Sequence, residues 1–294
     1  MKLLKLVPDN TNIGFLKWRV PFYVVSLLLM VASITLVMTR GLNLGVDFVG
    51  GQMIRVTFER SATAPVAELR NSIGALGYGE PIIQQFGKPN EISIRMKLPD
   101  GSDTDPALSD AMSGKITQTV KAGHADARID GIDSVSGKVS GELFETGMKA
   151  LIAAMVAISI YIWVRFEWQF GVGALFALVH DVTLTLGFFA LTQLEFDLNI
   201  VAALLTLIGY SPNDTTVIYD RIRENLKKYR RMPVPELLDL SVNETLARTV
   251  MTSLSILITL VALLLLGPPV IFGFTAAITL GIFVGTYSSV YMAA

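Results

Sequence analysis

The chain has 294 residues, of which 52% are hydrophobic and only 17% are charged, with a formal net charge of −1. A soluble domain carries about 25% charged residues, and the shortfall here lies in a few long apolar runs, which indicates membrane spans rather than one soluble core. Cysteine is absent and only two histidines occur, which excludes disulfides and thiolate or histidine-rich metal sites; we expect no metal, no cofactor and no nucleic-acid partner.

Six stretches are long and apolar enough to cross a bilayer. A span needs about 20 mostly apolar residues, and its backbone polar groups must be satisfied internally, so each is expected to be helical. The first stretch could be mistaken for a signal peptide, but its apolar run is too long and no A-x-A site follows it, so we predict that it is retained. The six predicted spans are 20–39, 149–164, 170–191, 199–219, 246–266 and 271–293.

The distribution of lysine and arginine predicts the orientation, because cytoplasmic loops are enriched in both. Such residues precede the first span and follow the fourth, whereas the short connections 192–198 and 267–270 carry none. We therefore expect both termini on the cytoplasmic side and one domain outside. The predicted divisions are a cytoplasmic N-terminus (1–19), the first span (20–39), an outer domain (40–147) and a five-helix membrane region (148–294).

The outer stretch is typical of a soluble domain with mixed α and β structure. Alternating apolar residues predict strands, and apolar residues on one helical face predict helices. In chain order these are strand 54–59, helix 66–76, strands 82–86 and 92–96, helix 108–120 and strand 127–135. The order βαββαβ is the ferredoxin-like pattern, so we expect a ferredoxin-like α+β domain between the first and second of six transmembrane helices.

Ionisable residues inside a membrane are costly and are functional candidates. Asp181 lies near the middle of the third span beside His180, Asp214 lies in the fourth, and Arg248 opens the fifth. Asp214 and Arg248 enter from the same side at similar depth, so we expect that they can pair. The structural alternatives are a hydrogen bond to a neighbouring helix for Asp214 and snorkelling for Arg248; we favour function for both, and both interpretations stay open for Asp181.

Three patterns surround these charges. Pro212 removes one helical hydrogen bond just before Asp214, and with Gly209 it predicts a hinge, although a static kink is the alternative. A polar stripe on the fifth span is expected to face protein or water, and small residues every fourth position on the sixth span predict close helix packing. The stripe is Thr245, Arg248, Thr252, Ser255 and Thr259, and the small residues are Gly273, Ala277, Gly281 and Gly285.

Several motifs together resemble the SecD/SecF family of protein-export membrane proteins, and most of all its SecF branch. The match runs in order over nearly the whole chain, and one departure is Pro212, where an aliphatic residue is expected. The matching stretches are Gly45-Val46-Asp47-Phe48-Val49-Gly50-Gly51, Phe166-Glu167, His180-Asp181, Gly187-Phe188-Phe189, Gly209-Tyr210-Ser211-Pro212-Asn213-Asp214-Thr215, residues 219–225 and residues 248–253.

The resemblance implies a non-enzymatic auxiliary subunit of the Sec translocase in the bacterial inner membrane, with the outer domain in the periplasm. It implies that the chain pairs with SecD as a transporter of the resistance-nodulation-division superfamily beside the SecYEG channel, and that proton flow helps to move preproteins. YajC and YidC are further candidate partners, and the translocating preprotein and membrane lipids are expected contacts.

The resemblance also assigns roles to individual residues. It implies that Asp214 and Arg248 are linked to transport. Asp181 and His180 are further proton-coupling candidates because of their position inside the third span. Asp47, Gly50 and Gly51 belong to the junction between the first span and the outer domain. The hinge motif is Gly209, Tyr210, Ser211, Pro212, Asn213 and Thr215.

Two other functions stay open. The sequence contains neither G-x-x-x-x-G-K-[ST] nor H-E-x-x-H, which argues against an ATPase and a membrane metalloprotease. Half of a proton-driven small-molecule efflux transporter is one alternative, although such a pump needs an apolar drug pocket and usually a larger outer domain. A structural assembly or insertase factor without transport is the other.

Overall fold

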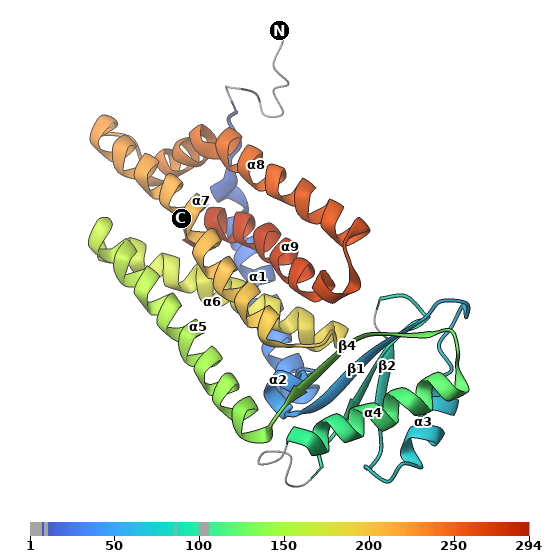
Figure 1. Ribbon diagram of the computed structural model, residues 1–294. Helices are drawn as coiled ribbons and strands as arrows, with labels where there is room; N and C mark the ends of the chain where they lie inside the picture. The colour runs from blue at the N-terminus through green and yellow to red at the C-terminus, as the bar shows by residue number, and fades with distance from the viewer. Residues whose placement is uncertain (1–7, 9–10, 86, 100–105, 294) are drawn as a thin grey trace. The chain divides into compact units, whose positions relative to one another are not determined.

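The computed structural model describes residues 8, 11–85, 87–99 and 106–293. It divides into two compact units. Leu44–Met148 forms one of them, and the segments Met1–Asn43 and Lys149–Ala294 form the other. Figure 1 shows the first as a sheet with helices and the second as a bundle of long helices.

The sheet unit contains the predicted strands and helices in the predicted order. Its strands are all paired antiparallel, in the order β2-β3-β1-β4, and α3 and α4 cover one face (Figure 1). The elements are α2 (Val46–Val49), β1 (Gly51–Phe58), α3 (Val66–Gly74), β2 (Ile82–Gln85), β3 (Glu91–Met96), α4 (Pro106–Gly123) and β4 (Ala127–Val135). The short helix α2 was not predicted.

The core of this unit lies between the sheet and its two helices. Alternate residues of β1, such as Ile54 and Val56, point into it because successive side chains of a strand face opposite sides. Leu69 and Ile73 from α3, and Ile116 from α4, cover them at helical spacing. The same alternation leaves Arg55 on the opposite face, where it pairs with Asp133 on β4 at 3.1 Å.

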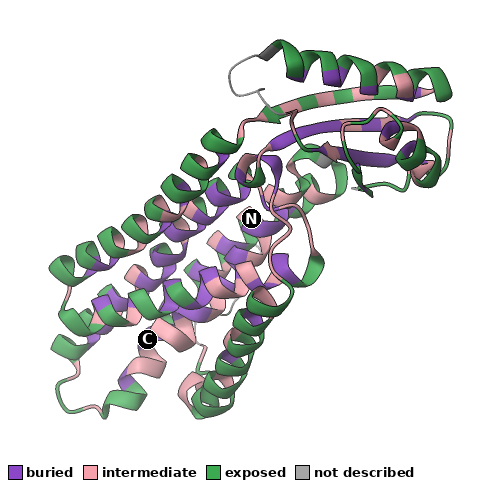
Figure 2. Ribbon diagram, turned by 90° about the horizontal axis from the view of Figure 1, so that it is seen from below, coloured by how far each residue is buried: buried purple, intermediate pink, exposed green. Residues whose placement is uncertain are grey.

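The helical unit is built from long helices with exposed outer faces. Figure 2 shows buried residues on the faces that the helices turn to one another. The helices are η1 (Phe15–Trp18), α1 (Arg19–Thr39), α5 (Gly137–Arg165), α6 (Trp168–Thr192), α7 (Leu198–Lys228), α8 (Val234–Leu266), η2 (Pro269–Ile271) and α9 (Phe272–Ser288), and a π-helical turn η3 (Ser289–Ala293) follows α9. The helix α5 begins within the sheet unit, at Gly137.

Five helices of the described chain are long and apolar enough to cross a membrane. They are Phe15–Thr39, Gly137–Arg165, Trp168–Thr192, Val234–Leu266 and Phe272–Ala293. The predicted span 199–219 lies within α7. This helix is not among the five, and its second half carries many polar residues. The count of six spans therefore stays a prediction. The helices α5 and α8 begin before the second and fifth predicted spans, at Gly137 and Val234.

Small residues let α9 approach α7 closely. A Cβ atom built on Gly281 would lie 2.5 Å from a side-chain carbon of Leu207, and one on Gly273 would lie 3.3 Å from Ile200. Ala277 is buried on the same face. The structure thus shows the small-residue stripe as a packing surface, as the spacing indicated. The chain continues as an uninterrupted helix through Pro212.

Candidate functional site

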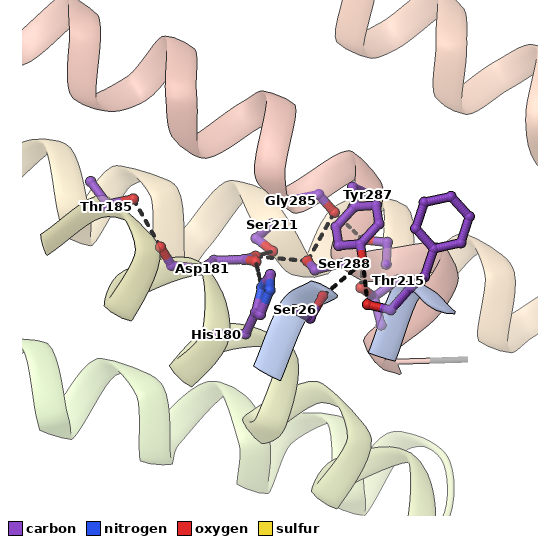
Figure 3. A network of polar contacts seen from close by, with 11 residues as sticks. Ser26, His180, Asp181, Thr185, Ser211, Thr215, Gly285, Tyr287 and Ser288 are labelled. Atoms are coloured by element: carbon purple, nitrogen blue, oxygen red, sulfur yellow. Dashed lines mark hydrogen bonds and ion pairs between the residues drawn. The ribbon is translucent and has the colours of Figure 1, made fainter. Parts of the chain in front are cut away.

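The carboxylate of Asp181 on α6 is fully buried within the helical unit (Figure 3). Its Oδ2 atom accepts hydrogen bonds from Ser211 on α7 at 2.7 Å and from Ser288 on α9 at 2.9 Å. Its Oδ1 atom lies 3.0 Å from Nδ1 of His180. We call His180, Asp181, Ser211 and Ser288 the Asp181 cluster.

The Asp181 cluster satisfies the physical conditions for keeping a charge inside a helix bundle. A buried charge is tolerated only when it is paired and hydrogen-bonded, and two hydroxyl donors and the imidazole ring of His180 surround this carboxylate. The side chains of His180 and Asp181 are 0% and 1% exposed. One atom is left over, because Nε2 of His180 is buried without a hydrogen-bond partner in the described chain.

A glycine and a helix irregularity position this cluster. A Cβ atom on Gly285 would lie 3.3 Å from the Ser211 hydroxyl and 3.5 Å from Oδ2 of Asp181, so glycine leaves room for both groups. The π-helical turn begins at Ser289, directly after Ser288. Single-turn π segments occur frequently at functional sites.

A second carboxylate, that of Asp214, lies on α7 one turn after Ser211. Asp214 is 5% exposed, and its Oδ2 atom accepts a hydrogen bond from Ser253 on α8 at 3.3 Å. The Ser253 hydroxyl lies 2.8 Å from the hydroxyl of Thr286 on α9. We call Asp214, Ser253 and Thr286 the Asp214 cluster. It joins α7, α8 and α9, as the Asp181 cluster joins α6, α7 and α9.

The predicted pairing of Asp214 with Arg248 is not present in this structure. No ion pair joins them among the residues described, and the side chain of Arg248 is exposed. Arg248 instead lines a cavity of about 450 Å³ between α5, α7 and α8. Arg221 in the same cavity is already engaged, at 2.8 Å from Glu224 and 3.6 Å from Glu244.

This chain encloses only part of the polar stripe predicted on the fifth span. Thr245 is buried, whereas Ser255 and Thr259 are exposed and their hydroxyls donate to carbonyl groups of their own helix. That protein or water faces the exposed part of the stripe stays a prediction. Thr245, Thr249 and Ser253 face the bundle at a spacing of four.

The hinge motif divides into a buried and an exposed side of α7. Ser211, Pro212 and Thr215 are buried, and Thr215 lies 2.9 Å from the hydroxyl of Ser289. Asn213 is exposed and Tyr210 is half-buried. A Cβ atom on Gly209 would meet nothing within 4 Å, so packing does not require glycine there.

Conformation explains the two glycines of the predicted junction. Gly50 and Gly51 have φ angles of +74° and +120°, which L side chains rarely adopt. A Cβ atom on Gly51 would also lie 2.6 Å from the carbonyl oxygen of Met96 on β3. The chain therefore turns from α2 into β1 only with glycine at this point. Asp47 lies in α2 and is half-buried.

Sequence reasoning missed the hydroxyl residues at the end of α9 and the start of η3, which contact Asp181, Ser253 and Thr215. Thr286, Ser288 and Ser289 are ordinary hydroxyl residues near the end of an apolar helix, and no single one stands out. Their signal is collective, since three hydroxyl residues and Tyr287 follow Gly285 within four positions. The Tyr287 hydroxyl donates to the carbonyl of Phe22 on α1 at 2.9 Å and lies 2.7 Å from Ser26.

Comparison with known families agrees with these motifs. The sequence model described as "Protein export membrane protein SecD/SecF, C-terminal" matches residues 115–294. A second model, the "SecD/SecF GG Motif", matches residues 35–62, which include both junction glycines. The chain belongs to the SecD/SecF family.

Curated relatives within the SecD/SecF family are similar over nearly the whole chain. The protein translocase subunit SecF of Rhodobacter capsulatus is 45% identical over 299 residues, covering 99% of this chain and 89% of that protein. That of Cereibacter sphaeroides is 45% identical over 294 residues, covering 99% and 90%. Together with the apolar helices, these relatives identify a membrane protein of the SecF type.

Solved SecDF structures share the fold. The crystal structure of SecDF, a translocon-associated membrane protein from Thermus thermophilus, superposes with a TM-score of 0.87 at 34% identity, covering 97% of this chain. A structure of SecDF in a super-membrane-facing form gives a TM-score of 0.65 at 32% identity. This chain spans only 38% of the length of each SecDF chain.

Proposed function

We propose that this chain is an auxiliary, non-enzymatic subunit of the Sec translocase, which acts with SecD to couple proton flow to the late movement of preproteins across the inner membrane. The observation that carries the proposal is a pair of buried carboxylates, Asp181 and Asp214, which fasten four helices together through serine and threonine hydroxyls. The names of the similar SecF and SecDF proteins supply the transport context.

The geometry supplies a route from protonation to movement. Hydrogen bonds to an ionised carboxylate are roughly twice as strong as those between neutral groups. Protonation of Asp214 therefore weakens its attachment to Ser253 on α8, and hence the link from α8 to Thr286 on α9. Arg248 lies on α8 as well, so a shift of α8 against α7 changes how strongly its positive charge acts on Asp214.

The energy available matches such a change. One proton that crosses a potential of 100 mV releases about 2.3 kcal/mol. At about 1.4 kcal/mol per tenfold change, this shifts an equilibrium between two helix arrangements nearly fifty-fold. Pro212, two residues before Asp214, removes one backbone hydrogen bond of α7 and so makes a hinge there less costly.

The wider architecture in this proposal follows the same family. The chain has six spans with both termini in the cytoplasm, and α7 provides the span that apolarity alone does not identify. The sheet unit is a ferredoxin-like periplasmic domain, supported by its βαββαβ order and its strand order β2-β3-β1-β4. SecD completes the membrane core beside SecYEG, with YajC and YidC as further partners, and the exposed polar stripe of α8 is a surface available to such a partner.

The test is preprotein translocation in proteoliposomes that contain the chain with its SecD and SecYEG partners, with and without an imposed proton gradient. Asp214→Asn keeps the shape of the side chain and removes its titratable charge. We expect it to abolish gradient-dependent stimulation while ATP-driven translocation and assembly persist. Asp110→Asn, an exposed change on α4, is the control. Full gradient-dependent stimulation in Asp214→Asn would contradict the assignment.

One further variant and a dye assay extend this test. Arg248→Lys keeps the positive charge but loses the planar guanidinium, so partial loss is expected. A fluorescent dye added to the same vesicles distinguishes preprotein export from small-molecule efflux. Gradient-driven dye efflux without stimulated translocation would favour the efflux transporter.

A further inference from the structure

His180 is a buried titratable group, and the roles proposed above for Asp214 and Arg248 do not involve it. We propose that the Nε2 atom of His180 holds the transported proton at one stage of the cycle, with Asp181 as its fixed negative partner. The inference rests on the proposed proton coupling and names an atom within it. It places a second protonation step on α6, next to that of Asp214 on α7.

The first argument is the unpartnered nitrogen. Nδ1 of His180 is 3.0 Å from Asp181, whereas Nε2 is buried without a hydrogen-bond partner among the residues described. Buried polar atoms in folded proteins are almost always hydrogen-bonded, so an exception calls for a functional or solvent partner.

The pair of His180 and Asp181 has two charge states when Asp181 is ionised. The Oδ2 atom of Asp181 accepts from two hydroxyl groups, and its Oδ1 atom faces Nδ1 of His180. A neutral His180 gives the pair a net charge of −1, and a protonated His180 gives it a net charge of zero. The cluster can thus exist in two charge states that differ by one proton on the histidine, while the carboxylate keeps its hydrogen bonds in both.

Among the residues described, no group other than Asp181 forms an ion pair with His180. The ring centroid of Tyr287 on α9 lies 6.1 Å from that of His180, and the Tyr287 hydroxyl lies 2.7 Å from Ser26 on α1. The Tyr287 hydroxyl donates to the carbonyl of Phe22, and the ring centroid of Tyr291 on η3 lies 5.4 Å from that of Tyr287. From α7 the cluster receives the uncharged Ser211 hydroxyl.

The Asp181 cluster also transmits the charge state to other helices. Protonation of His180 adds a positive charge beside Oδ1 and so draws electron density away from Oδ2, where Ser211 and Ser288 bind. The attachment of α6 to α7 and α9 weakens accordingly. Ser211 and Asp214 are three residues apart and share one side of α7, so both protonation steps act on the same helix.

Because the chain contains only two histidines, the protonation state can be observed directly. The chain is labelled with 15N-histidine, assembled with its SecD partner in nanodiscs, and its imidazole nitrogens are followed by NMR from about pH 5 to pH 9. The spectrum of His124→Asn assigns the remaining signals to His180. We expect Nε2 to gain and lose a proton within this range. A single unchanging neutral tautomer of His180 throughout would overturn the proposal.

The transport experiment uses His180→Asn, whose amide retains a donor near Asp181 but has no second nitrogen to protonate. We expect at least a tenfold loss of gradient-dependent translocation with unchanged SecD assembly, and no loss in His124→Asn.

Full gradient dependence in His180→Asn would overturn the inference while leaving the proposed function intact. A wild-type complex without any gradient dependence would instead refute the proposed function, and the NMR titration would still decide the state of His180. If His180→Asn does not assemble, that titration alone decides.

Discussion

The hydroxyl of Ser211 on α7 donates a hydrogen bond of 2.7 Å to Oδ2 of Asp181 on α6. Both groups are buried, and Ser211 directly precedes Pro212 in the helix. The bond therefore fixes α7 to α6 at the place where the α7 backbone has lost an internal hydrogen bond. It links the two carboxylate clusters through one turn of α7.

We predict that Ser211→Ala destabilises the helical unit, because it leaves a buried carboxylate with one donor fewer. The expected loss of unfolding free energy is about 1–3 kcal/mol, measured by thermal unfolding of the detergent-solubilised complex. Ser255→Ala is the matched control, since the Ser255 hydroxyl is exposed and donates only to Met251 of its own helix. Equal effects of the two changes would show that the bond to Asp181 contributes nothing.

Two glycines that look equivalent in sequence differ in their surroundings, which gives the second prediction. Gly281→Ala should cost about 1–3 kcal/mol, because its Cβ atom would overlap Leu207. Gly209→Ala should be neutral or stabilise α7 by up to about 1 kcal/mol, since nothing lies within 4 Å of its Cβ position. Thermal unfolding of both variants measures the difference.

The same Gly209 variant tests the hinge hypothesis. If α7 bends at this point during the cycle, Gly209→Ala slows gradient-dependent translocation while unfolding occurs at the same or a higher temperature. Wild-type translocation together with unchanged stability would mean that Gly209 is only a tolerated residue.

The third prediction concerns the junction glycines of the sheet unit. Gly51→Ala should destabilise the pairing of β1 with β3, because alanine at a φ of +120° is strained and its Cβ would lie 2.6 Å from the carbonyl of Met96. Hydrogen exchange in the full chain should show faster exchange of the β1 and β3 amides. Gly114→Ala on α4, where nothing lies within 4 Å, is the control and should leave the sheet unchanged.

The fold was predictable where one physical signal dominates. Strict alternation in β1 and β3 located both strands within a few residues, and apolar runs located six long helices. The bounds of these helices depend on several signals at once. The helix α7 is amphipathic along 31 residues, so apolarity marks only its first part. The helix α8 begins at Val234, after Pro233 and before its apolar stretch, so hydropathy marks only its later part.

The candidate site was predictable in its charges but not in its partners. An aspartate in an apolar helix is conspicuous, so Asp181 and Asp214 were found. Their partners are serines and threonines, which occur in membrane helices for several reasons and can satisfy themselves by bonding to their own helix. Thr252 does this and Ser253 does not, and only the packing of α8 against α7 and α9 decides between these two neighbours.

The last prediction concerns Asn243 on α8, whose side chain is hydrogen-bonded to the backbone of the segment before α1. Its Oδ1 atom accepts from the amide of Ile13 at 2.9 Å, and its Nδ2 atom donates to the carbonyl of Ile13 at 2.8 Å. Three residues along, the amide of Leu16 is held separately by Asp239, at 2.9 Å. Asn243→Ala removes both bonds to Ile13 and leaves the bond to Leu16, so hydrogen exchange should rise strongly at Ile13 and little at Leu16. Asn213→Ala, an exposed change on α7, should alter neither amide. A local loss of about 1–2 kcal/mol of hydrogen-bond free energy acts only on the amide that loses its acceptor. Equal acceleration of exchange at Ile13 and Leu16 would therefore show instead that the whole segment detaches from α8.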